Sequence, residues 1–557
     1  MVTAAKFQEA FLSDACAAKT QVLDDNRVNR WKLGELLNAF MELEELRTAC
    51  SVISDKELDL LVNVELRDLC SDSRELVANS LFVALEGQTY RAEENIHEAV
   101  NKGALAVIAE GVTPGFSFYR KACSADRIPL IKLPRLHERL SRIASVFLNI
   151  KKTMSVFGVT GTNGKTTCAW MLAKAHASFD ESAAVVGTLG YGILRTDGDS
   201  ELQSTGMTTP DAVKTQRILA ELACLDCSVV AMEVSSHALS QWRVAAVDIK
   251  TAIFTNLSHD HLDYHSSMEE YAAAKIKLFK MDSVKYAVIN LDDPYAHKFI
   301  SNLNPRATYL TYSTSDEKAD VRALRAEFNI GGIATQIHTP IGELDLNLNL
   351  IGRFNLSNAL AVIAGLLSNG KTLEQVASVM QVLSPPPGRA QRIGLRDSAA
   401  GEVSIGEEDI VAVVDFAHTP DALKNILQAL KEHCVGELWC VFGCGGDRDK
   451  LKRAEMARVA ELEADRVVVT RDNSRSEDPA EIFADICQGF SADFPVEIEP
   501  ERKQAINNAV LRAGAGDVVL IAGKGHEQFI DEAGKRIPFL DAEQVRVALE
   551  LRMGCAA

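Results

Sequence analysis

Short apolar runs alternate with helix-like patterns between residues 81 and 150. Apolar runs of five residues, the length of a buried strand, occupy residues 81–85 and 105–109, and residues 130–133 are apolar except for Lys132. Over residues 94–102 and 136–150, apolar residues recur every three to four positions, as they do on one face of a helix. This alternation predicts a small α/β domain.

A second alternation follows. An apolar run at residues 155–159 leads into a glycine-rich turn, and a helical pattern covers residues 165–177. Further apolar runs occupy residues 228–232, 251–254 and 286–289, with helical stretches between them. Strands separated by helices are typical of a doubly wound parallel sheet.

The sequence Ser-Pro-Pro-Pro-Gly at residues 384–388 precedes a third alternation. Three consecutive prolines cannot continue a helix and favour a stiff extended segment. The strands predicted after it lie at residues 410–414, 438–442, 467–470 and 518–522, and the helices at 420–431, 480–490 and 502–513. We therefore expect an α/β chain of three domains, over residues 29–153, 154–384 and 385–557, preceded by an extension of unknown role over residues 1–28.

The composition of the 557 residues is that of an average globular protein, with 47% hydrophobic and 24% charged residues. The 59 Lys and Arg against 77 Asp and Glu give a net charge of −18, which disfavours binding to nucleic acid or anionic membranes. No uninterrupted apolar stretch approaches 18 residues, so no transmembrane helix is expected. The N-terminal residues lack the apolar segment of a signal peptide, which favours a cytoplasmic location.

Twelve cysteines are scattered along the chain, many of them within apolar runs. This distribution is typical of reduced thiols in a cytosolic protein. Cys224 and Cys227 form the one Cys-x-x-Cys pair. A redox or metal-binding role is one interpretation of this pair, but no second pair stands at zinc-finger spacing, so a structural role is favoured.

The segment from Gly158 to Thr167 reads Gly-Val-Thr-Gly-Thr-Asn-Gly-Lys-Thr-Thr, between a predicted strand and a predicted helix. Glycines let backbone amides wrap a polyphosphate, and a helix N-terminus adds partial positive charge. The strict Walker A pattern fails by one position, because Val159 stands where it requires glycine. The predicted contacts with a nucleoside triphosphate are Gly161, Thr162, Asn163, Gly164, Lys165, Thr166 and Thr167, with Lys165 at the β- and γ-phosphates and Thr166 at Mg²⁺. Such a loop does not specify the reaction.

Polar residues follow the next two predicted strands of the same sheet. Glu233 ends one apolar run, where a carboxylate in a sheet with a phosphate loop is well placed to bind Mg²⁺. The sequence Ser-His-Asp-His-Leu-Asp at residues 258–263 follows the other strand. Its histidines and aspartates have the chemistry to ligate a metal or orient a substrate. A polar surface loop is the open alternative for each histidine, including His261.

Lys275 lies in a predicted helix, with Tyr271 four residues before it and Phe279 four residues after it. These spacings place the three side chains on one face. An ammonium among apolar neighbours is unusual, and removing it from water favours the neutral, nucleophilic amine. Such an amine can carry a carbamate derived from CO₂, which turns a cation into a metal-binding anion. The alternative is an ordinary lysine whose charged end reaches water.

The phosphate loop, Glu233, the His261 loop and the Lys275 helix together resemble the Mur ligase family of peptidoglycan synthesis. The resemblance implies a UDP-binding N-terminal α/β domain, a central P-loop domain that binds ATP, and a C-terminal Rossmann-like domain that binds an amino acid. It implies that Thr166 binds the Mg²⁺ shared with ATP, that a carbamoylated Lys275 binds a second Mg²⁺, and that Glu233 and His261 are metal ligands. Lys165, Lys275 and His261 would be the catalytic residues.

Further segments are similar to those of family members that add the third residue of the stem peptide: residues 72–74, 81–87, 208–210, 233–243, 352–358, 415–420, 443–449 and 523–527. The implied contacts with the UDP-muramoyl peptide are Ser73, Arg74, Thr208, Thr209, Ser235 and Arg243. Asn355 and Asn358 would reach the adenine of ATP. The incoming amino acid would contact Arg448, Asp472, Asn473, Arg475, Gly523 and Glu527.

Residues 472–475 bear on which amino acid is added. Family members that select meso-diaminopimelate read Asp-Asn-Pro-Arg in this segment, whereas Ser474 stands here in place of the proline. The guanidinium of Arg475 suits the distal carboxylate of diaminopimelate. L-lysine has no such carboxylate and ends in a cation, which Arg475 would repel. The segment therefore favours meso-diaminopimelate, with L-lysine as the alternative.

The reaction that the resemblance implies is ATP-dependent formation of an amide bond, by a monomer without a membrane span or nucleic-acid partner. ATP would phosphorylate the D-glutamate γ-carboxylate of UDP-N-acetylmuramoyl-L-alanyl-D-glutamate, and the amine of meso-diaminopimelate would displace phosphate from the acyl phosphate.

Three other interpretations stay open. A folylpolyglutamate synthetase-like ligase would lack the uridine segment. A catalytically silent scaffold should have lost residues such as Lys165 or Glu233. A P-loop NTPase switch needs no amino-acid pocket.

Overall fold

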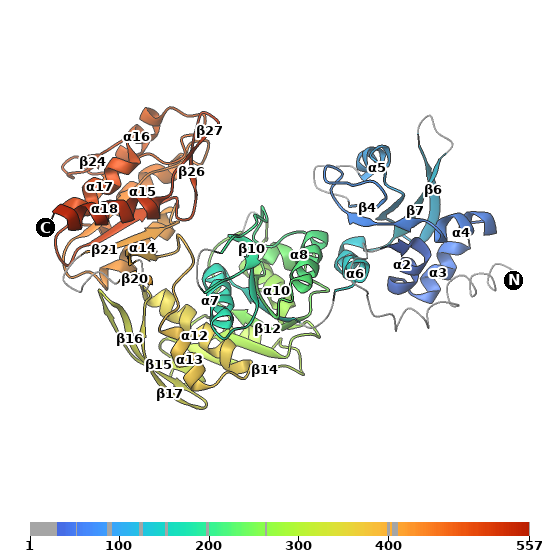
Figure 1. Cartoon of the computed structure of the whole chain (residues 1–557), viewed down its shortest axis with the longest axis horizontal. Coiled ribbons are helices and arrows are strands. Elements are labelled where there is room, and N and C mark those ends of the chain that lie inside the picture. Colours follow the sequence, from blue (N-terminus) through green and yellow to red (C-terminus); the bar gives the residue numbers. More distant parts are fainter. Residues whose placement is uncertain are drawn as a thin grey trace. The chain divides into compact units, whose positions relative to one another are not determined.

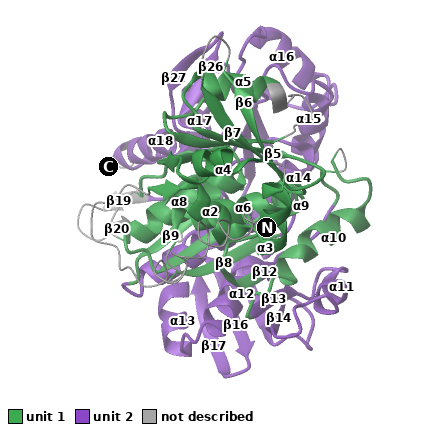
Figure 2. Cartoon of the chain, turned by 90° about the vertical axis from the view of Figure 1, so that its right-hand side faces the viewer, with its two compact units in different colours: residues 1–160, 181–252, 259–285 green, residues 161–180, 253–258, 286–557 purple. Residues whose placement is uncertain are grey.

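A computed structural model of the chain describes residues 30–51, 53–85, 92–121, 126–150, 154–196, 200–261, 264–397, 401–403 and 410–555 (Figure 1). The extension predicted over residues 1–28 lies outside the described residues. The chain forms two compact units, each assembled from separate stretches of sequence (Figure 2). Unit 1 comprises Met1–Thr160, Glu181–Ala252 and His259–Lys285, and unit 2 comprises Gly161–Asp180, Ile253–Ser258 and Tyr286–Ala557.

The N-terminal sheet of unit 1 has the strand order β3-β4-β5-β7-β6 and is parallel except where β6 pairs with β7. Its strands are β3 (Asp68–Cys70), β4 (Ser80–Ala84), β5 (Ala106–Glu110), β6 (Gly115–Arg120) and β7 (Arg127–Leu133), with β1 (Trp31–Lys32) and β2 (Glu65–Leu66) paired separately. The helices are α2 (Leu33–Phe40), α3 (Leu43–Cys50), α4 (Asp55–Val62), α5 (Ala92–Asn101) and α6 (Leu136–Leu148). Alternate residues of β4 face opposite sides: Leu81 and Val83 join a core with α2 and α6, and Phe82 and Ala84 join one with α5. The strands and helices predicted for residues 81–150 are confirmed.

The second group of strands in unit 1 begins with β8. Strands β9, β11 and β8 are parallel in that order, and β10 is antiparallel to β9. The elements are β8 (Ser155–Thr160), β9 (Ala183–Gly187), β10 (Gly190–Ile193), α8 (Ala212–Cys224), β11 (Val229–Glu233), α9 (Ser236–Ser240), β12 (Ile249–Phe254) and α10 (Met268–Phe279). Every residue of β9 and β11 is buried, which is why β11 reads as a continuous apolar run. The predicted strands at 155–159, 228–232 and 251–254 are confirmed.

Unit 2 contains the helix after the phosphate loop and a set of strands that begins with β13. The elements are α7 (Lys165–Ala177), β13 (Tyr286–Asn290), α11 (Ala296–Ile300), β14 (Thr308–Ser313), β15 (Val321–Asn329), β16 (Gly332–Thr339), β17 (Gly342–Leu348), α12 (Arg353–Ser368) and α13 (Leu373–Met380). Strands β13 to β15 are parallel, and β15 to β17 form an antiparallel meander. The meander was not predicted, because its buried and exposed residues largely alternate and give no continuous apolar run. Helix α12 packs against α7 and β14.

The C-terminal sheet of unit 2 has the order β18-β21-β25-β22-β23-β24, parallel except for β18. The elements are β18 (Gln391–Ile393), β19 (Leu395–Asp397), β20 (Gly401–Val403), β21 (Val411–Asp415), α14 (Pro420–Lys431), β22 (Leu438–Phe442), α15 (Leu451–Glu463), β23 (Arg466–Val469), α16 (Pro479–Cys487), β24 (Glu497–Ile498), α17 (Arg502–Arg512), β25 (Val518–Ala522), β26 (Phe529–Glu532), β27 (Lys535–Pro538) and α18 (Asp541–Cys555). One face packs against α14, α15 and α16, and the other against α17 and α18. All strands and helices predicted after the proline linker are confirmed.

Two sequence predictions about membranes and thiols can be compared with the structure. Among the described residues, no helix is long and apolar enough to cross a membrane. Cys224 and Cys227 are both free thiols, and Cys227 is buried while Cys224 is exposed.

Candidate nucleotide and ligation site

The phosphate loop of unit 2 is shaped by glycines. Gly161 and Gly164 have φ angles of +155° and +83°, which side chains rarely allow. A Cβ atom at Gly161 would lie 1.9 Å from Oγ1 of Thr255, and one at Gly164 would lie 2.4 Å from Oδ1 of Asn358. The loop is therefore packed so closely against its neighbours that only glycine fits at either position.

Two residues that sequence reasoning missed hold this loop in place. The backbone N–H groups of Thr162 and Asn163 donate to the carbonyl and the side-chain oxygen of Asn256, at 2.8 and 2.9 Å. The Thr255 hydroxyl donates to the Asn163 carbonyl at 2.5 Å. Thr255 and Asn256 directly follow the predicted strand at residues 251–254. Ligand sites of open α/β sheets lie at the carboxyl ends of strands, so this position was the sequence signal for their role.

Lys165 begins α7 and folds over the loop. Its Nζ donates to the carbonyl oxygens of Gly161 at 2.9 Å and Thr162 at 2.7 Å. Thr166 and Thr167 complete the first turn of the helix. This turn brings the ammonium group, the loop and the positive end of the helix dipole together, an arrangement suited to polyphosphate.

A cavity of about 520 Å³ lies beside the phosphate loop within unit 2, a volume within the usual range for small-molecule sites. Its lining includes Asn163, Gly164, Thr167, Asn256, Arg353, Phe354, Asn355, Asn358, Arg389, Asp415, Asn425 and Glu432. Asn355 and Asn358, predicted to reach adenine, are buried and hydrogen-bonded to each other at 3.0 Å. The structure thus brings them to the same cavity as the loop.

Asp415 contributes a carboxylate to this cavity from the carboxyl end of β21. It accepts hydrogen bonds from the backbone N–H groups of Ala390 at 2.7 Å and Ala417 at 2.8 Å. Burial raises the pKa of its carboxyl group above the usual range. Arg389, whose guanidinium lies 4.9 Å from the ring centre of Phe416, lines the same cavity and was not predicted. Neither role is visible in sequence, since both residues are far from the phosphate loop along the chain.

In unit 1, the predicted contacts with the muramoyl peptide gather around Glu233. Its carboxylate accepts from the backbone N–H of Thr188 at 2.7 Å, and its carbonyl accepts from the Thr209 hydroxyl at 2.8 Å. Thr209 in turn accepts from the Ser235 N–H at 3.0 Å, and its carbonyl accepts from Arg243 at 2.8 Å. The Thr188 hydroxyl also donates to that of Thr208 at 3.2 Å. The geometry therefore joins Thr208, Thr209, Glu233, Ser235 and Arg243, and adds Thr188.

His261 and Lys275 meet around the ring of Tyr271. The ring centres of His261 and Tyr271 are 6.1 Å apart, and Nζ of Lys275 lies 4.5 Å from the Tyr271 centre. His237, which follows β11, contacts His261 edge-on with ring centres 5.0 Å apart. Lys275 is only 1% exposed, so the interpretation as a lysine whose charged end reaches water is wrong. Asp263 lies outside the described residues.

The predicted Mg²⁺ ligands can be tested by their chemistry. Thr166 belongs to unit 2 and the other three to unit 1. Among the described residues, no group of three or more His, Cys, Asp or Glu side chains could hold a metal ion as it stands. Glu233 supplies a carboxylate and His261 an imidazole, whereas unmodified Lys275 has no oxygen donor. A carbamate on Lys275 would supply the oxygen donors that Mg²⁺ prefers, so the three residues of unit 1 fit the ion only with Lys275 modified.

The predicted amino-acid contacts lie at the carboxyl ends of β22, β23 and β25. Asn473 donates to the carboxylate of Glu527 at 2.8 Å. Gly523 has a φ of +114°, and a Cβ there would meet the Asp472 carboxylate at 2.8 Å. Lys524, which was not predicted, is fully buried and donates to Asn473 at 3.0 Å and Glu527 at 2.8 Å. The sequence signal that could have identified Lys524 is its position between two glycines directly after a buried strand.

Three remaining predicted residues lie elsewhere on their domains. Arg448 is exposed in the loop after β22. Ser73 follows β3 and donates to Glu98 at 2.7 Å. Arg74 is exposed and forms an ion pair with Asp72 at 2.6 Å. The described geometry assigns no ligand to these residues, and their predicted roles stay predictions.

Comparison with known proteins agrees with this geometry. Residues 159–366 match the Mur ligase middle domain, and residues 402–525 match the Mur ligase glutamate ligase domain. A UDP-N-acetylmuramoyl-L-alanyl-D-glutamate–2,6-diaminopimelate ligase of Ectopseudomonas mendocina is 43% identical over 489 residues, 87% of this chain and 95% of that protein. A ligase of the same name from Pseudomonas aeruginosa is 42% identical over 494 residues, 88% of this chain and 96% of that protein.

Solved structures give the same result. A structure of a ligase of that name is 35% identical with a TM-score of 0.66, and the match covers 88% of this chain and 96% of the other. A folylpolyglutamate synthase of Mycobacterium tuberculosis, at 19% identity and a TM-score of 0.53 over 70% of this chain and 92% of that chain, shares the fold alone. The chain therefore belongs to the Mur ligase family of ATP-dependent amide ligases.

Proposed function

We propose that the chain joins meso-diaminopimelate to the D-glutamate γ-carboxylate of UDP-N-acetylmuramoyl-L-alanyl-D-glutamate, with cleavage of ATP to ADP and phosphate, in peptidoglycan precursor synthesis. The observation that carries this proposal is the polar site after β23 and β25. One loop there offers the guanidinium of Arg475, and Asn473 of the same loop binds the carboxylate of Glu527. A cation and an anion of this kind suit a substrate with a carboxylate and an amine at its distal end.

The residues divide the chemistry between them. We propose that the loop from Gly161 to Thr167 holds the phosphates of ATP while Lys165 neutralises charge that develops during phosphoryl transfer. Asn355 and Asn358 would contact the adenine within the adjoining cavity. Ser73, Arg74 and the Thr209–Arg243 pair would bind the UDP-muramoyl dipeptide.

The acyl phosphate provides the driving force for amide formation. Its carbonyl carbon is attacked by the amine of meso-diaminopimelate, a C–N bond forms, and phosphate leaves with the electron pair of the broken C–O bond. The amine loses one proton in this step. Asp472, Arg448 and Gly523 would line the amino-acid site beside Arg475 and Glu527.

We propose two Mg²⁺ ions: Thr166 would hold the one shared with ATP, and the Lys275 carbamate would bind the second, with Glu233 and His261 as further metal ligands. The ions would supply positive charge during phosphoryl transfer. Two observations support the carbamate. Lys275 is buried against Tyr271, and no group of three or more His, Cys, Asp or Glu side chains among the described residues could hold a metal ion without it. In forming it, the neutral amine adds to CO₂ and releases one proton. Glu233 is kept in place by its hydrogen bond from Thr188.

Phosphate release by the purified chain tests the proposal. With ATP, Mg²⁺, bicarbonate and UDP-N-acetylmuramoyl-L-alanyl-D-glutamate present, we expect kcat/KM with meso-diaminopimelate to exceed that with L-lysine by at least about a hundredfold, because L-lysine offers Arg475 no distal carboxylate and ends in a cation that the guanidinium repels. Turnover with lysine alone would keep the ligase and reverse the substrate. Turnover with neither, in a folded sample, would favour a silent scaffold, and phosphate release without any acceptor would favour an NTPase.

Replacing Arg475 by alanine tests its role as the selecting residue. We expect KM for meso-diaminopimelate to rise about thirtyfold to a hundredfold, the value of a hydrogen bond between charged groups, while KM for ATP stays within twofold. Arg466→Ala is the matched control, because it removes an exposed arginine paired with Glu437 in the same domain. Equal effects of the two substitutions on KM would refute the assignment.

A further inference from the structure

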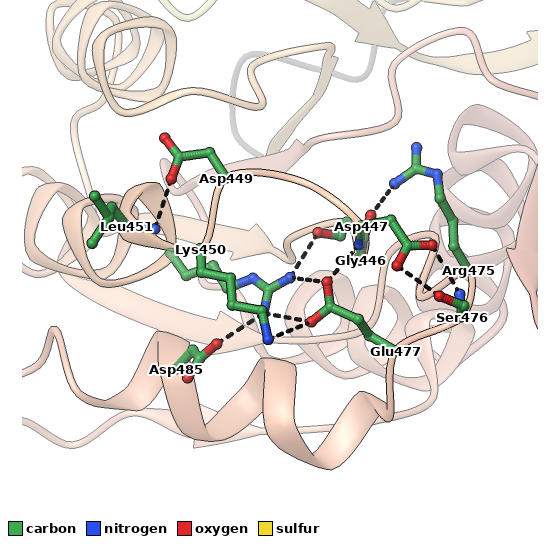
Figure 3. A network of polar contacts seen from close by, with 11 residues as sticks. Gly446, Asp447, Asp449, Lys450, Leu451, Arg475, Ser476, Glu477 and Asp485 are labelled. Carbon is green, nitrogen blue, oxygen red and sulfur yellow. Dashed lines mark hydrogen bonds and ion pairs between the residues drawn. The ribbon is translucent and has the colours of Figure 1, made fainter.

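Two loops at the carboxyl ends of β22 and β23 are tied to each other by polar contacts (Figure 3). The N–H of Gly446 in the first loop donates to the carbonyl of Asn473 in the second at 2.9 Å. The Ser476 hydroxyl donates to the Asp447 carboxylate at 2.7 Å. The Asp447 N–H donates to the carboxylate of Glu477 at 2.5 Å. The second loop carries Arg475, so the first loop acts as its support.

Glu477 is the centre of this network. Its Oε1 accepts from Asp447 N–H and from Nη2 of Arg453, and its Oε2 accepts from Nη1 of Arg453, both arginine contacts being 3.0 Å. Lys450 adds an ion pair at 3.3 Å. Hydrogen bonds from Arg453 and the Asp447 N–H hold the pKa of Glu477 at about 2, so it is ionised at neutral pH. Both carboxylate oxygens are engaged within the protein.

Arg453 holds the Glu477 carboxylate in place through two hydrogen bonds. Its side chain is fully buried, and it also donates to Asp485 of α16 at 2.8 Å. A further contact of 3.3 Å joins it to the carbonyl of Gly445 in the first loop. A buried guanidinium with two carboxylate partners has a fixed position, because rotating it would leave buried charge unpaired.

The network ends at the side chain of Arg475. Nη1 of Arg475 donates to the carbonyl oxygen of Gly446 at 2.5 Å (Figure 3). Its φ of +51° is strained for a residue with a side chain. Its N–H donates to the backbone carbonyl of Asp531 at 3.0 Å, and its carbonyl accepts from the N–H of Ala533 at 2.7 Å. Those two bonds fix the backbone of Arg475, whereas Gly446 directs its guanidinium.

We infer that Glu477 is a positioning residue for substrate selection: held by Arg453, it fixes the Gly446–Asp447 turn and thereby aims Arg475 at the distal carboxylate of the incoming amino acid. This inference rests on the proposed function, which gives Arg475 that carboxylate. A bidentate contact between guanidinium and carboxylate depends on direction, and a displacement of about 1 Å is costly.

A merely structural role for Glu477 would be to neutralise buried Arg453. Asp485 shares that task, since it binds the same guanidinium. Asp485 accepts from Nη1 of Arg453 at 2.8 Å, and Figure 3 shows Asp485 on the helix below the two loops. Removing the charge of Asp485 therefore disturbs Arg453 as Glu477→Gln does, and spares the direct contact between Glu477 and Asp447.

The experiment compares Glu477→Gln with Asp485→Asn in the full-length chain. For Glu477→Gln, we expect KM for meso-diaminopimelate to rise at least about tenfold, with kcat within threefold and KM for ATP within twofold. The preference for meso-diaminopimelate over L-lysine should fall by the same factor as kcat/KM. For Asp485→Asn, we expect a lower Tm and an unchanged KM. Glu437→Gln, which breaks an exposed pair with Arg466, controls for charge loss.

Each result bears on the inference. An unchanged KM in Glu477→Gln, or an equal rise in Asp485→Asn, would overturn it while leaving the proposed function intact. If wild-type protein does not turn over with meso-diaminopimelate, the proposed function fails and the inference fails with it. Should Glu477→Gln not fold, Ser476→Ala removes a bond to Asp447 without touching Arg453. We expect that variant to raise the same KM about threefold, and no rise would overturn the inference.

Discussion

We expect the Lys165→Met variant to lose at least about a thousandfold in kcat for phosphate release, about 4 kcal/mol of transition-state stabilisation. Methionine keeps most of the length of lysine and removes the ammonium charge together with its hydrogen bonds to Gly161 and Thr162. The Lys165 ammonium lies over the carbonyls of Gly161 and Thr162, at the loop that binds the phosphates in our proposal. Charge that develops on the transferred phosphoryl group would then lack its nearest fixed cation.

The Lys165→Met substitution should weaken ADP binding much less than it lowers kcat. Backbone amides and the α7 dipole still face the phosphates in Lys165→Met, so we expect Kd for ADP to rise about tenfold or less. Lys174→Met is the matched control, because this lysine lies later in α7, with Nζ 5.5 Å from the ring centre of Trp170. We expect Lys174→Met to keep kcat within twofold. A kcat for Lys165→Met within tenfold of wild type would exclude the catalytic role.

The second large effect concerns Lys275. We expect Lys275→Ala to lower kcat about a thousandfold, because the proposed second Mg²⁺ then loses its carbamate ligand. Lys277→Ala is the control: Lys277 is exposed on the same helix, with Nζ 5.1 Å from the ring centre of Trp242. We expect it to retain kcat within threefold.

A measurement that does not depend on turnover distinguishes a carbamate on Lys275 from a purely structural role of this buried lysine. Wild-type protein supplied with ¹³C-bicarbonate should give a carbamate signal by NMR, and so should Lys277→Ala. Lys275→Ala should give none. If wild type shows no such signal but Lys275→Ala is inactive, the lysine would matter as a buried cation against Tyr271, and the carbamate assignment would be wrong.

The sequence alone predicted much of the fold, since the predictions used local patterns. Strands β4, β5, β8, β11, β12, β21, β22, β23 and β25 are buried runs that leave a continuous apolar signature. The exposed face of the β15–β17 meander leaves only an alternation, and these strands were not predicted. The phosphate loop was also visible, because its glycines, lysine and hydroxyl lie within ten consecutive residues.

What only the tertiary structure decided is which distant residues support these motifs. Parallel strands linked by crossovers bring Asn256 to the phosphate loop and Asp415 to the nucleotide cavity, although the chain separates them by many residues. The contact between Arg453 and Glu477 likewise depends on how α15 packs beside the β23 loop. Local pattern cannot encode such pairings, because they follow from strand order and helix packing. The sequence thus determined the chemistry available to this ligase, and the tertiary structure determined how that chemistry is held in place.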